Sequence, residues 1–292
     1  MGPIDQIDDQ NNVQYAFIGA GVMAEVMMSG LLEAGLLAPR QLCASDKSAS
    51  RRATLEATLG VQTTADNRAC AARAPVVVLA VKPQNLAEVL AELAGQLAPE
   101  TVVLSIVAGA RIRALQAGLG HARVARCMPN LPCRIRRGMT VWTLPDPHQD
   151  ADLDRVRQLL RTMGEEVYVD DEGHIDRATA VSGSGPAIVA EFIKAMCEAA
   201  VYVGEPRGVA HDTVLATVIG TAEMIRAAGR DHTHVAQLID EVTSPGGTTS
   251  RALQVLKRGH LAATVTEAIE AAHERTVTLG DALERSLEAQ RR

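Results

Sequence analysis

Short runs rich in β-branched residues alternate with longer Ala- and Leu-rich stretches in the first part of the chain. This alternation predicts a parallel sheet with crossover helices. The runs at 76–81 and 102–106 are apolar on both faces rather than alternating, so we expect central strands that are covered on both sides. The predicted strands are Val13–Ile18, Gln41–Ser45, Val76–Val81, Val102–Ile106, Arg123–Cys127, Thr140–Leu144 and Val167–Val169.

Apolar residues at helical spacing predict helices between these strands at Met23–Glu33 and Leu86–Leu97. Past residue 175 the strand pattern ends. Pro186 stands where a first helical turn would begin, and apolar residues follow it at helical intervals. Further helices are predicted at His211–Ala228, His234–Val242, Ser250–Arg258 and Leu261–Leu279.

The predicted helix at 211–228 is apolar and Ala-rich around more than one face, which is more than a small domain would cover. We therefore expect this half to be all-helical and to pack against a second copy of itself. The pattern divides the chain into a disordered leader at 1–12, an α/β domain at 13–172 and a helical domain at 173–292.

Composition narrows the classes of partner. The 292 residues carry a net charge of −6 and only 2% aromatic residues, which disfavours binding to nucleic acid. No run approaches the roughly 18 apolar residues that a membrane span requires. The N-terminus is polar and acidic, unlike a signal peptide.

The five cysteines are scattered and odd in number, which argues against a disulfide framework and for a reducing compartment. We therefore expect a cytoplasmic protein. Cys127 and Cys133 have no clustered histidine or carboxylate beside them, so we interpret the cysteines as small buried hydrophobic residues and predict no metal site.

The first predicted strand runs directly into Gly19-Ala20-Gly21-Val22-Met23-Ala24. In a G-x-G-x-x-G/A turn of this kind, Gly19 permits the tight bend, Gly21 lets the backbone approach a pyrophosphate, and Ala24 allows the helix to pack closely on the strand. The pyrophosphate would lie at the positive end of the helix. We predict a Rossmann dinucleotide-binding domain.

The second predicted strand ends in Ser45-Asp46-Lys47-Ser48. An acid at this point favours the ribose 2′-hydroxyl of NAD, whereas a hydroxyl and a cation favour the 2′-phosphate of NADP. Asp46 supports the first alternative, and Ser45, Lys47 and a nearby arginine at 51 or 52 support the second. We expect NADP(H) to be favoured over NAD(H).

Two glycine-rich segments with hydroxyl groups precede predicted helices in the second half, at 182–186 and 243–249. Each would place unpaired backbone N–H groups at a helix N-terminus, where a carboxylate or phosphate can bind. A single segment of this kind would be an ordinary N-cap, but two behind a dinucleotide fold favour a small-anion site.

The sequence offers no nucleophile elbow, paired carboxylates or metal cluster. A hydride transfer to an electrophilic acceptor such as a protonated C=N bond needs none of them. Lys82, at the end of a central strand, is either a charge near the cofactor or a surface lysine. We expect a group of seven arginines to form a solvated surface: Arg111, Arg113, Arg123, Arg126, Arg134, Arg136 and Arg137.

The chain resembles the pyrroline-5-carboxylate reductase family over about residues 13–280. The resemblance rests on the glycine turn at 19–24, Val81-Lys82-Pro83-Gln84, the segment at 105–109, Met128-Pro129-Asn130, and the segments at 182–187 and 243–249, in the family's order and approximate spacing. It implies reduction of 1-pyrroline-5-carboxylate to L-proline by hydride from NADPH or NADH, the last step of proline synthesis. It also implies an intertwined homodimer, often assembled into rings.

The resemblance also implies the roles of individual residues. Thr249 would be the catalytic residue, orienting the ring nitrogen while the substrate binds already protonated or takes its proton from water. The substrate-binding set is Glu172, Ser182, Glu241, Gly246, Gly247, Thr248 and Thr249. The cofactor-binding set is Ile18, Gly19, Ala20, Gly21, Val22, Met23, Ala24, Ser45, Lys47, Asn67, Ala80, Val81, Lys82, Pro83, Ala108, Gly109, Met128, Pro129 and Asn130.

Several positions depart from the family pattern. Leu131 stands for a Thr and Ile188 for a Tyr, which leaves open another cyclic imino acid as substrate. A β-hydroxy acid dehydrogenase is a rival that would need Lys194 as proton donor, because this is the only lysine between residues 172 and 241. A non-catalytic NADP sensor is a third reading, and the second glycine-rich segment argues against it.

Overall fold

The computed structural model describes residues 12–145, 150–229 and 233–289, so that the predicted leader, apart from residue 12, lies outside the described residues. Packing divides the chain into two compact units. The first comprises residues 1–184 and 272–292, and the second comprises residues 185–271. Residues 173–184 and the end of the last helix thus pack with the α/β part, and the predicted boundary at 172 does not coincide with the division by packing.

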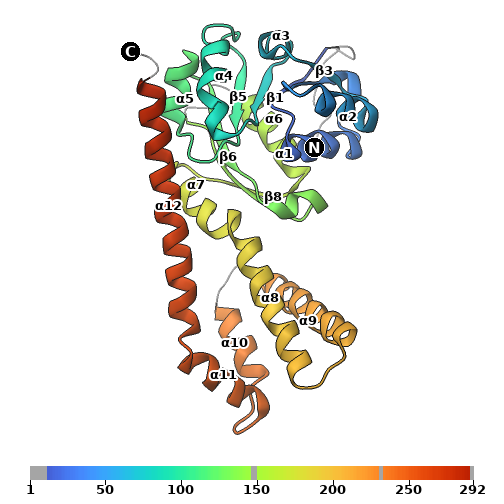
Figure 1. Cartoon of the computed structure of the whole chain (residues 1–292), viewed down its shortest axis with the longest axis vertical. Helices are drawn as coiled ribbons and strands as arrows, with labels where there is room; N and C mark the ends of the chain where they lie inside the picture. The colour runs from blue at the N-terminus through green and yellow to red at the C-terminus, as the bar shows by residue number, and fades with distance from the viewer. Residues whose placement is uncertain (1–11, 146–149, 230–232, 290–292) are drawn as a thin grey trace. The chain divides into compact units, whose positions relative to one another are not determined.

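The first unit is built on one eight-stranded sheet with the order β3-β2-β1-β4-β5-β6-β7-β8 (Figure 1). Neighbouring strands are parallel from β3 to β6, β7 is antiparallel to β6, and β8 is parallel to β7. The strands are β1 Tyr15–Ile18, β2 Leu42–Ser45, β3 Gln62–Thr64, β4 Val76–Leu79, β5 Val102–Ser105, β6 Val124–Met128, β7 Gly138–Thr143 and β8 Gly164–Tyr168.

Helices cover both faces of this sheet. Successive residues of β1 and β4 point into different hydrophobic clusters, with Phe17 and Val78 in one and Ile18 and Leu79 in the other. This confirms the prediction that the apolar runs at 76–81 and 102–106 are central strands buried on both sides. The helices of this unit are α1 Val22–Glu33, α2 Ala49–Leu59, α3 Asn67–Ala71, α4 Leu86–Leu93, α5 Ile112–Leu119, α6 Asp150–Arg161 and α7 Gly173–Ala178.

The hydrophobic pattern missed or misjudged a few of these elements. The edge strand β3 has the polar sequence Gln-Thr-Thr, which carries no apolar signal. The predicted helix at 86–97 ends at Leu93 because Gly95 takes the left-handed conformation with φ 67°. Helices α2, α3, α5, α6 and α7 were not predicted.

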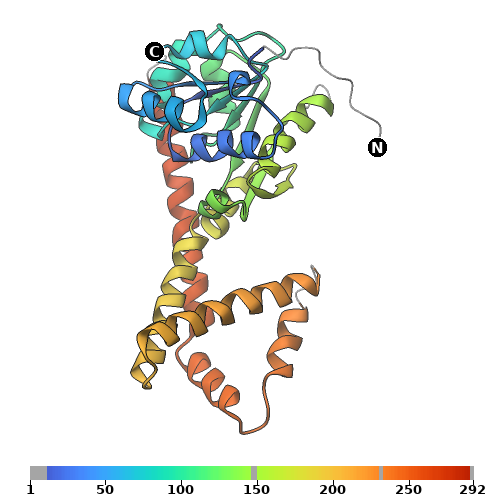
Figure 2. The ribbon, with the colours of Figure 1, turned by 90° about the vertical axis from the view of Figure 1, so that its right-hand side faces the viewer.

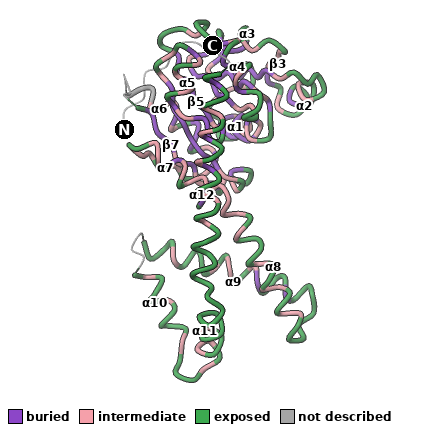
Figure 3. The backbone as a smooth tube through the Cα atoms, turned by 60° about the vertical axis from the view of Figure 1, so that its left-hand side comes forward, coloured by how far each residue is buried: buried purple, intermediate pink, exposed green. Residues whose placement is uncertain are grey.

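The second unit contains helices only in its described residues, as predicted for this half (Figure 2). The helix α8 packs along α9, and α9 contacts α10. Its hydrophobic residues are mostly exposed or half-buried, with Ala210 and Val214 the buried ones among the residues described from 185 to 271 (Figure 3). The helices are α8 Gly185–Tyr202, α9 Arg207–Ala227, α10 Thr233–Glu241, α11 Thr248–Arg258 and the first part of α12 Leu261–Ala289.

Candidate functional site

The glycine turn lies at the carboxyl end of β1, between the strand and α1. Gly19 has φ 92°, and a Cβ built on it would lie 2.8 Å from Val81 Cγ1, so only glycine fits. Gly21 is the N-cap of α1, and a Cβ there would meet only Ala80 O, at 3.9 Å. The structural demand is therefore at Gly19, while the space beside Gly21 is open to a ligand. Ala24 is fully buried against the sheet, as its predicted role requires.

This turn stands where the strand order reverses, with β2 on one side of β1 and β4 on the other. In open α/β sheets, ligands bind at such a switch point, outside the carboxyl ends of the strands. The predicted cofactor residues that follow β1, β4, β5 and β6 all lie at this edge because these strands are parallel. They are the segments 18–24, 80–83, 108–109 and 128–130.

The residues after β2 form a hydrogen-bonded group beside the turn. Ser45 Oγ donates to Asn67 Oδ1 at 2.7 Å. The Asp46 carboxylate is occupied by the backbone, accepting from Ala20 N at 3.0 Å and from Ser48 N at 2.8 Å. Asp46 thus holds the glycine turn in place. Lys47 is exposed, and its ammonium contacts both carboxylate oxygens of Glu88 at 2.7 Å, a contact that raises the pKa of Lys47.

The two arginines that follow differ in their placement. Arg51 Nε donates to Ala20 O, and its Nη2 pairs with Glu25 at 2.6 Å, so this side chain supports the glycine turn from outside. Arg52 Nη1 donates to the carbonyl of Asp46 at 2.7 Å.

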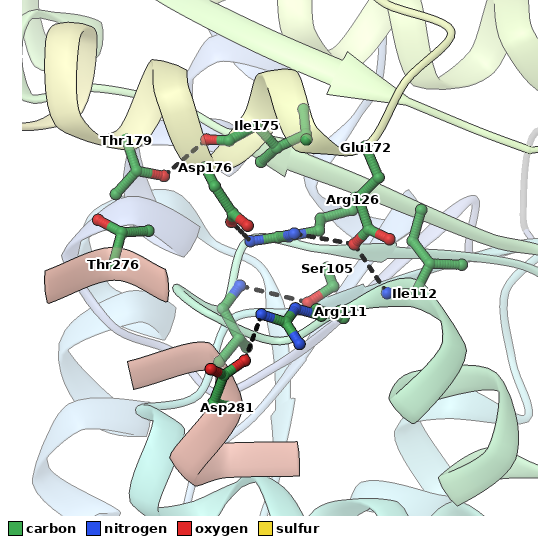
Figure 4. Close-up of polar contacts among 12 residues, drawn as sticks. Ser105, Arg111, Ile112, Arg126, Glu172, Ile175, Asp176, Thr179, Thr276 and Asp281 are labelled. Carbon is green, nitrogen blue, oxygen red and sulfur yellow. Dashed lines mark hydrogen bonds and ion pairs between the residues drawn. The ribbon is translucent and has the colours of Figure 1, made fainter. Parts of the chain in front are cut away.

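The Ala108–Gly109 turn is held by the last part of α12. Gly109 has φ 76°, and a Cβ on it would lie 3.1 Å from Gly280 N, so the two backbones touch. Arg111 then pairs with Asp281 at 2.5 Å (Figure 4) and also with Glu284 at 2.9 Å.

The Met128-Pro129-Asn130 segment lies at the end of β6. Its first two residues are buried, and its last residue is a hydrogen-bonded asparagine. Asn130 Nδ2 donates to Ser182 Oγ at 3.2 Å, and Asn130 Oδ1 accepts from Met139 N at 3.0 Å. This pair joins a predicted cofactor residue to a predicted substrate residue within the first unit.

The segment at 182–186 corrects one expectation. It is not an open helix N-terminus, because residues 179–183 form a π-helical turn, η4, that continues from α7 towards α8. Ser184 N donates to Thr179 O at 3.0 Å, five residues back, so this amide is already paired. An anion site formed by free amides is therefore not what this segment provides, and Ser182 presents its hydroxyl instead.

The prediction that the seven arginines form a solvated surface is wrong for Arg126. Arg126 is fully buried in β6. Its guanidinium donates to Glu172 Oε1 at 2.8 Å and to Asp176 Oδ1 at 2.7 Å (Figure 4). Arg111 and Arg113 both pair with Glu284. Sequence reasoning missed Arg126, although a charged residue in the middle of a predicted strand was a signal that it needed buried partners.

The predicted substrate carboxylate site belongs to the second unit. Gly246 has φ 70°, and Gly247 is the N-cap of α11. Thr248 and Thr249 are the first two residues of this helix, two residues earlier than the predicted start at Ser250. Amides in a first helical turn lack intrahelical partners, so this end of α11 suits an anion. Glu241 is exposed at the end of α10.

Other candidate chemistry is not assembled in the described parts of the chain. Lys194 is exposed and lies 3.3 Å from Glu191, one helical turn away. The residues from 12 to 145, 150 to 229 and 233 to 289 hold no group of three or more potential metal ligands. Four of the five cysteines are buried, and burial raises the pKa of the Cys127 thiol. Among the helices described, none has the length and apolar character needed to cross a membrane.

The strand order and the glycine turn define a dinucleotide-binding fold of the Rossmann type. Residues 14–109 match the family model described as "NADP oxidoreductase coenzyme F420-dependent", and residues 172–279 match "Pyrroline-5-carboxylate reductase dimerisation". Similarity to curated proteins extends over nearly the whole chain. The chain belongs to the pyrroline-5-carboxylate reductase family, and its helical part is an oligomerisation domain of that family.

The relatives come from distant organisms. The pyrroline-5-carboxylate reductase of Synechocystis is 38% identical over 92% of this chain and 99% of its own length. That of Pseudomonas aeruginosa is 38% identical over 92% of this chain and 97% of its own. A solved structure of the Coxiella burnetii pyrroline-5-carboxylate reductase is 34% identical with a TM-score of 0.84, covering 92% of this chain and 99% of that one. The Plasmodium falciparum pyrroline carboxylate reductase, solved with NADP bound, is 28% identical with a TM-score of 0.82 and the same coverage.

Proposed function

We propose that this protein reduces 1-pyrroline-5-carboxylate to L-proline, with hydride from NADPH. The observation that carries the proposal is the intact Thr-Ser-Pro-Gly-Gly-Thr-Thr segment at 243–249, which begins α11 in a chain that also holds a complete dinucleotide turn. A protein that only binds the nucleotide would need the dinucleotide turn and not the segment at 243–249.

The residues of the first unit fit a dinucleotide. The open side of Gly21 leaves room for a pyrophosphate beside the N-terminus of α1, and Asp46 holds the turn in the required shape. When bound, the reduced nicotinamide supplies the hydride. Val81, Ala108 and the segment 128–130, at the same edge of the sheet, would orient its ring.

The residues of the second unit would hold the substrate. The first-turn amides of α11 and the Thr248 hydroxyl would bind the carboxylate. The Thr249 hydroxyl would orient the ring nitrogen. A threonine hydroxyl is too weak an acid to protonate an imine, so the substrate would bind protonated or take its proton from water.

Two observations support a preference for NADP. Each oxygen of the Asp46 carboxylate accepts a backbone hydrogen bond, which commits this acid to supporting the glycine turn. Lys47 and Ser48 are exposed at the same edge, where a 2′-phosphate would be paired.

The cofactor preference is tested by replacing this lysine. Lys47→Met should lower kcat/KM with NADPH by about 5–10-fold and leave the value with NADH nearly unchanged, because one charge-assisted contact to phosphate is lost. Arg40→Met is the matched control, since it removes an exposed positive charge before β2, at the opposite end of the strand. Equal losses with both cofactors, or a wild-type preference for NADH, would contradict the NADP assignment.

The helical unit is proposed to form an intertwined homodimer that can assemble into a ring. The support is its exposed apolar side chains, such as Val189, Ile219 and Val255, each at least half exposed in the single chain. Such a surface is typical of an obligate interface.

A larger cyclic imino acid is the second candidate substrate. Leu131 is 57% exposed directly after the Met128-Pro129-Asn130 segment, and Ile188 stands in the first turns of α8, where the family has hydroxyl-bearing residues. A β-hydroxy acid would need Lys194 as proton donor, and this lysine is exposed on α8, 3.3 Å from Glu191.

The proposed function is tested with purified protein, NADPH and 1-pyrroline-5-carboxylate, followed by loss of the nicotinamide absorbance. Six-membered cyclic imino acids and β-hydroxy acids are compared in parallel. We expect the highest kcat/KM with the five-membered ring. Absence of any turnover at micromolar enzyme would refute the proposal, and a higher value with the larger ring would move it to the second candidate.

A further inference from the structure

Arg126 is an unusual residue for its position. It lies in the middle of β6, its side chain has no exposed surface, and its strand neighbours are Ser105 on β5 and Thr143 on β7. A fully buried arginine is costly because its charge leaves water, and replacing a buried ion pair by apolar residues is often neutral or stabilising. Stability alone therefore gives no reason for a cation here.

The guanidinium has two separate arms. One nitrogen donates to Glu172, which precedes α7, and the other donates to Asp176, one turn later on that helix (Figure 4). The carboxylates are 29% and 15% exposed, so both are largely removed from water. The planar guanidinium holds its N–H donors in a rigid fork, so that two different nitrogens can bind two such groups in fixed directions.

The Glu172 arm continues to a third element. Its Oε1, which accepts from Arg126, also accepts from Ile112 N at 2.9 Å. Ile112 is the first residue of α5, so Glu172 caps that helix from outside. The Ala108–Gly109 turn ends three residues before this contact. Glu172 is thereby hydrogen-bonded to the chain three residues beyond the turn that α12 touches at Gly280.

The Asp176 arm leads to the segment that carries Ser182. Asp176 anchors α7, and the π-helical turn at 179–183 follows directly. Arg126 itself lies two residues before Met128. The hydrogen bond between Asn130 and Ser182 therefore joins two segments that Arg126 already holds at their other ends.

We propose that Arg126 is a positioning residue, and that its two arms align different parts of the site: the Glu172 arm sets the cofactor-side turn at 108–109, and the Asp176 arm sets Ser182 against Asn130. Glu172 acts through α5 and does not bind substrate directly. This inference rests on the proposed function for the assignment of the two sides, while the arrangement of the arms is independent of it.

We predict opposite kinetic effects when the Glu172 and the Asp176 carboxylates are removed separately. Glu172→Ala should raise the KM for NADPH about tenfold and leave the KM for 1-pyrroline-5-carboxylate within about twofold. Asp176→Ala should raise the KM for 1-pyrroline-5-carboxylate about tenfold and leave the KM for NADPH within about twofold. Arg126→Met should impair both, and Arg126→Lys should recover part of the loss because an ammonium can still reach one carboxylate.

Glu166→Ala is the matched control. Glu166 is also a largely buried carboxylate, which accepts from Trp142 Nε1 and pairs with Arg157 and Arg161, but it lies on β8, two strands from β6. Its loss should lower the melting temperature as the arm variants do, without separating the two KM values.

Amide hydrogen exchange keeps the test separate from turnover. In protein without ligands, Glu172→Ala should speed exchange at 108–115 and Asp176→Ala at 177–184, each by at least about tenfold. If wild-type protein shows no reductase activity, the proposed function fails, while exchange and the affinity for NADPH still decide the role of Arg126.

Three results would overturn the inference. One is an equal change in both KM values for both arm variants. Another is a Glu172→Ala variant that raises only the KM for the imino acid, which would show direct substrate contact. The third is amide exchange in both arm variants that, at 108–115 and 177–184, does not differ from exchange in Glu166→Ala. If Arg126→Met does not fold, the single-arm variants and Arg126→Lys decide the question.

Discussion

The two glycines of the dinucleotide turn differ in whether the fold itself requires a glycine. Gly19 and Gly21 have the same side chain and lie two positions apart, yet only Gly19 is forced by its own protein, through φ 92° and the close approach of Val81. Gly21 has an ordinary extended conformation and open space beside it. Because the fold does not require glycine at position 21, we infer that the residue is small there in order to leave space for a ligand.

Gly21→Val should therefore raise the cofactor KM about tenfold or more with little change in melting temperature, because the added side chain occupies ligand space. Gly19→Ala is the comparison and should lower the melting temperature, since its Cβ cannot be accommodated. Steady-state kinetics and thermal unfolding provide the two measurements. A Gly21 variant with an unchanged KM would argue against the nucleotide assignment.

Thr249 provides the prediction on the substrate side. Thr249→Ala should reduce kcat/KM roughly 5–150-fold, equivalent to about 1–3 kcal/mol for one hydrogen bond in the hydride-transfer geometry. Thr249→Ser retains the hydroxyl and should restore most of the rate. An Ala variant with wild-type kinetics would remove Thr249 from the site.

At the scale of elements, the long helix α12 is joined to the α5 region by charges as well as by backbone contact. Glu284 accepts from Arg113 at 2.6 Å and from Arg111 at 2.9 Å. These hydrogen bonds hold the pKa of Glu284 below its ordinary value of 4.5, and the one from Arg113 has the largest effect. A carboxyl with a lowered pKa stabilises the folded state above its unfolded pKa, and this contribution is lost as the pH falls through the folded value.

Glu284→Gln should thus destabilise the protein at neutral pH by at most about 1 kcal/mol, because the pairs are near the surface. The difference from wild type should stay constant down to about pH 4.5 and shrink below it. Urea unfolding at fixed protein concentration measures this. A difference that grows as the pH falls would contradict the assigned sign.

At the scale of the whole molecule, the two units differ in how far they complete their own cores. The sheet of the first unit carries two clusters of buried side chains, one on each face. The described residues of the second unit leave most of their apolar side chains accessible. Because that apolar surface would be in contact with water in a single chain, folding of the second unit should be linked to association.

Ile219→Asp, on α9, should convert the oligomer to a smaller species and reduce activity, because a charge would be buried without a partner. Leu36→Asp places the same charge at an exposed apolar position of the first unit, 41% exposed, and should leave the mass unchanged. Light scattering after gel filtration determines both masses. A wild-type chain that is monomeric at micromolar concentration would refute the dimer.

The sequence by itself determined the architecture, because strand and helix periods, the glycine turn and the Gly-Gly-Thr-Thr segment are local patterns. The expectation that the helical half packs against a second copy also came from the sequence, because its excess of apolar positions can be read from the residues alone. The amino-acid pattern could not show β3, whose polar residues belong to the sheet only through pairing with β2.

Only the tertiary structure decided what the charged and hydroxyl residues do. Arg126 is a buried residue and not a surface one, because its partners Glu172 and Asp176, 46 and 50 residues away in sequence, are brought to it by the fold. The Asp46 carboxylate supports the glycine turn by accepting from the amide of Ala20, a residue 26 positions away in sequence. Periodicity records which face a side chain occupies, whereas the partner of a charge depends on how distant elements pack.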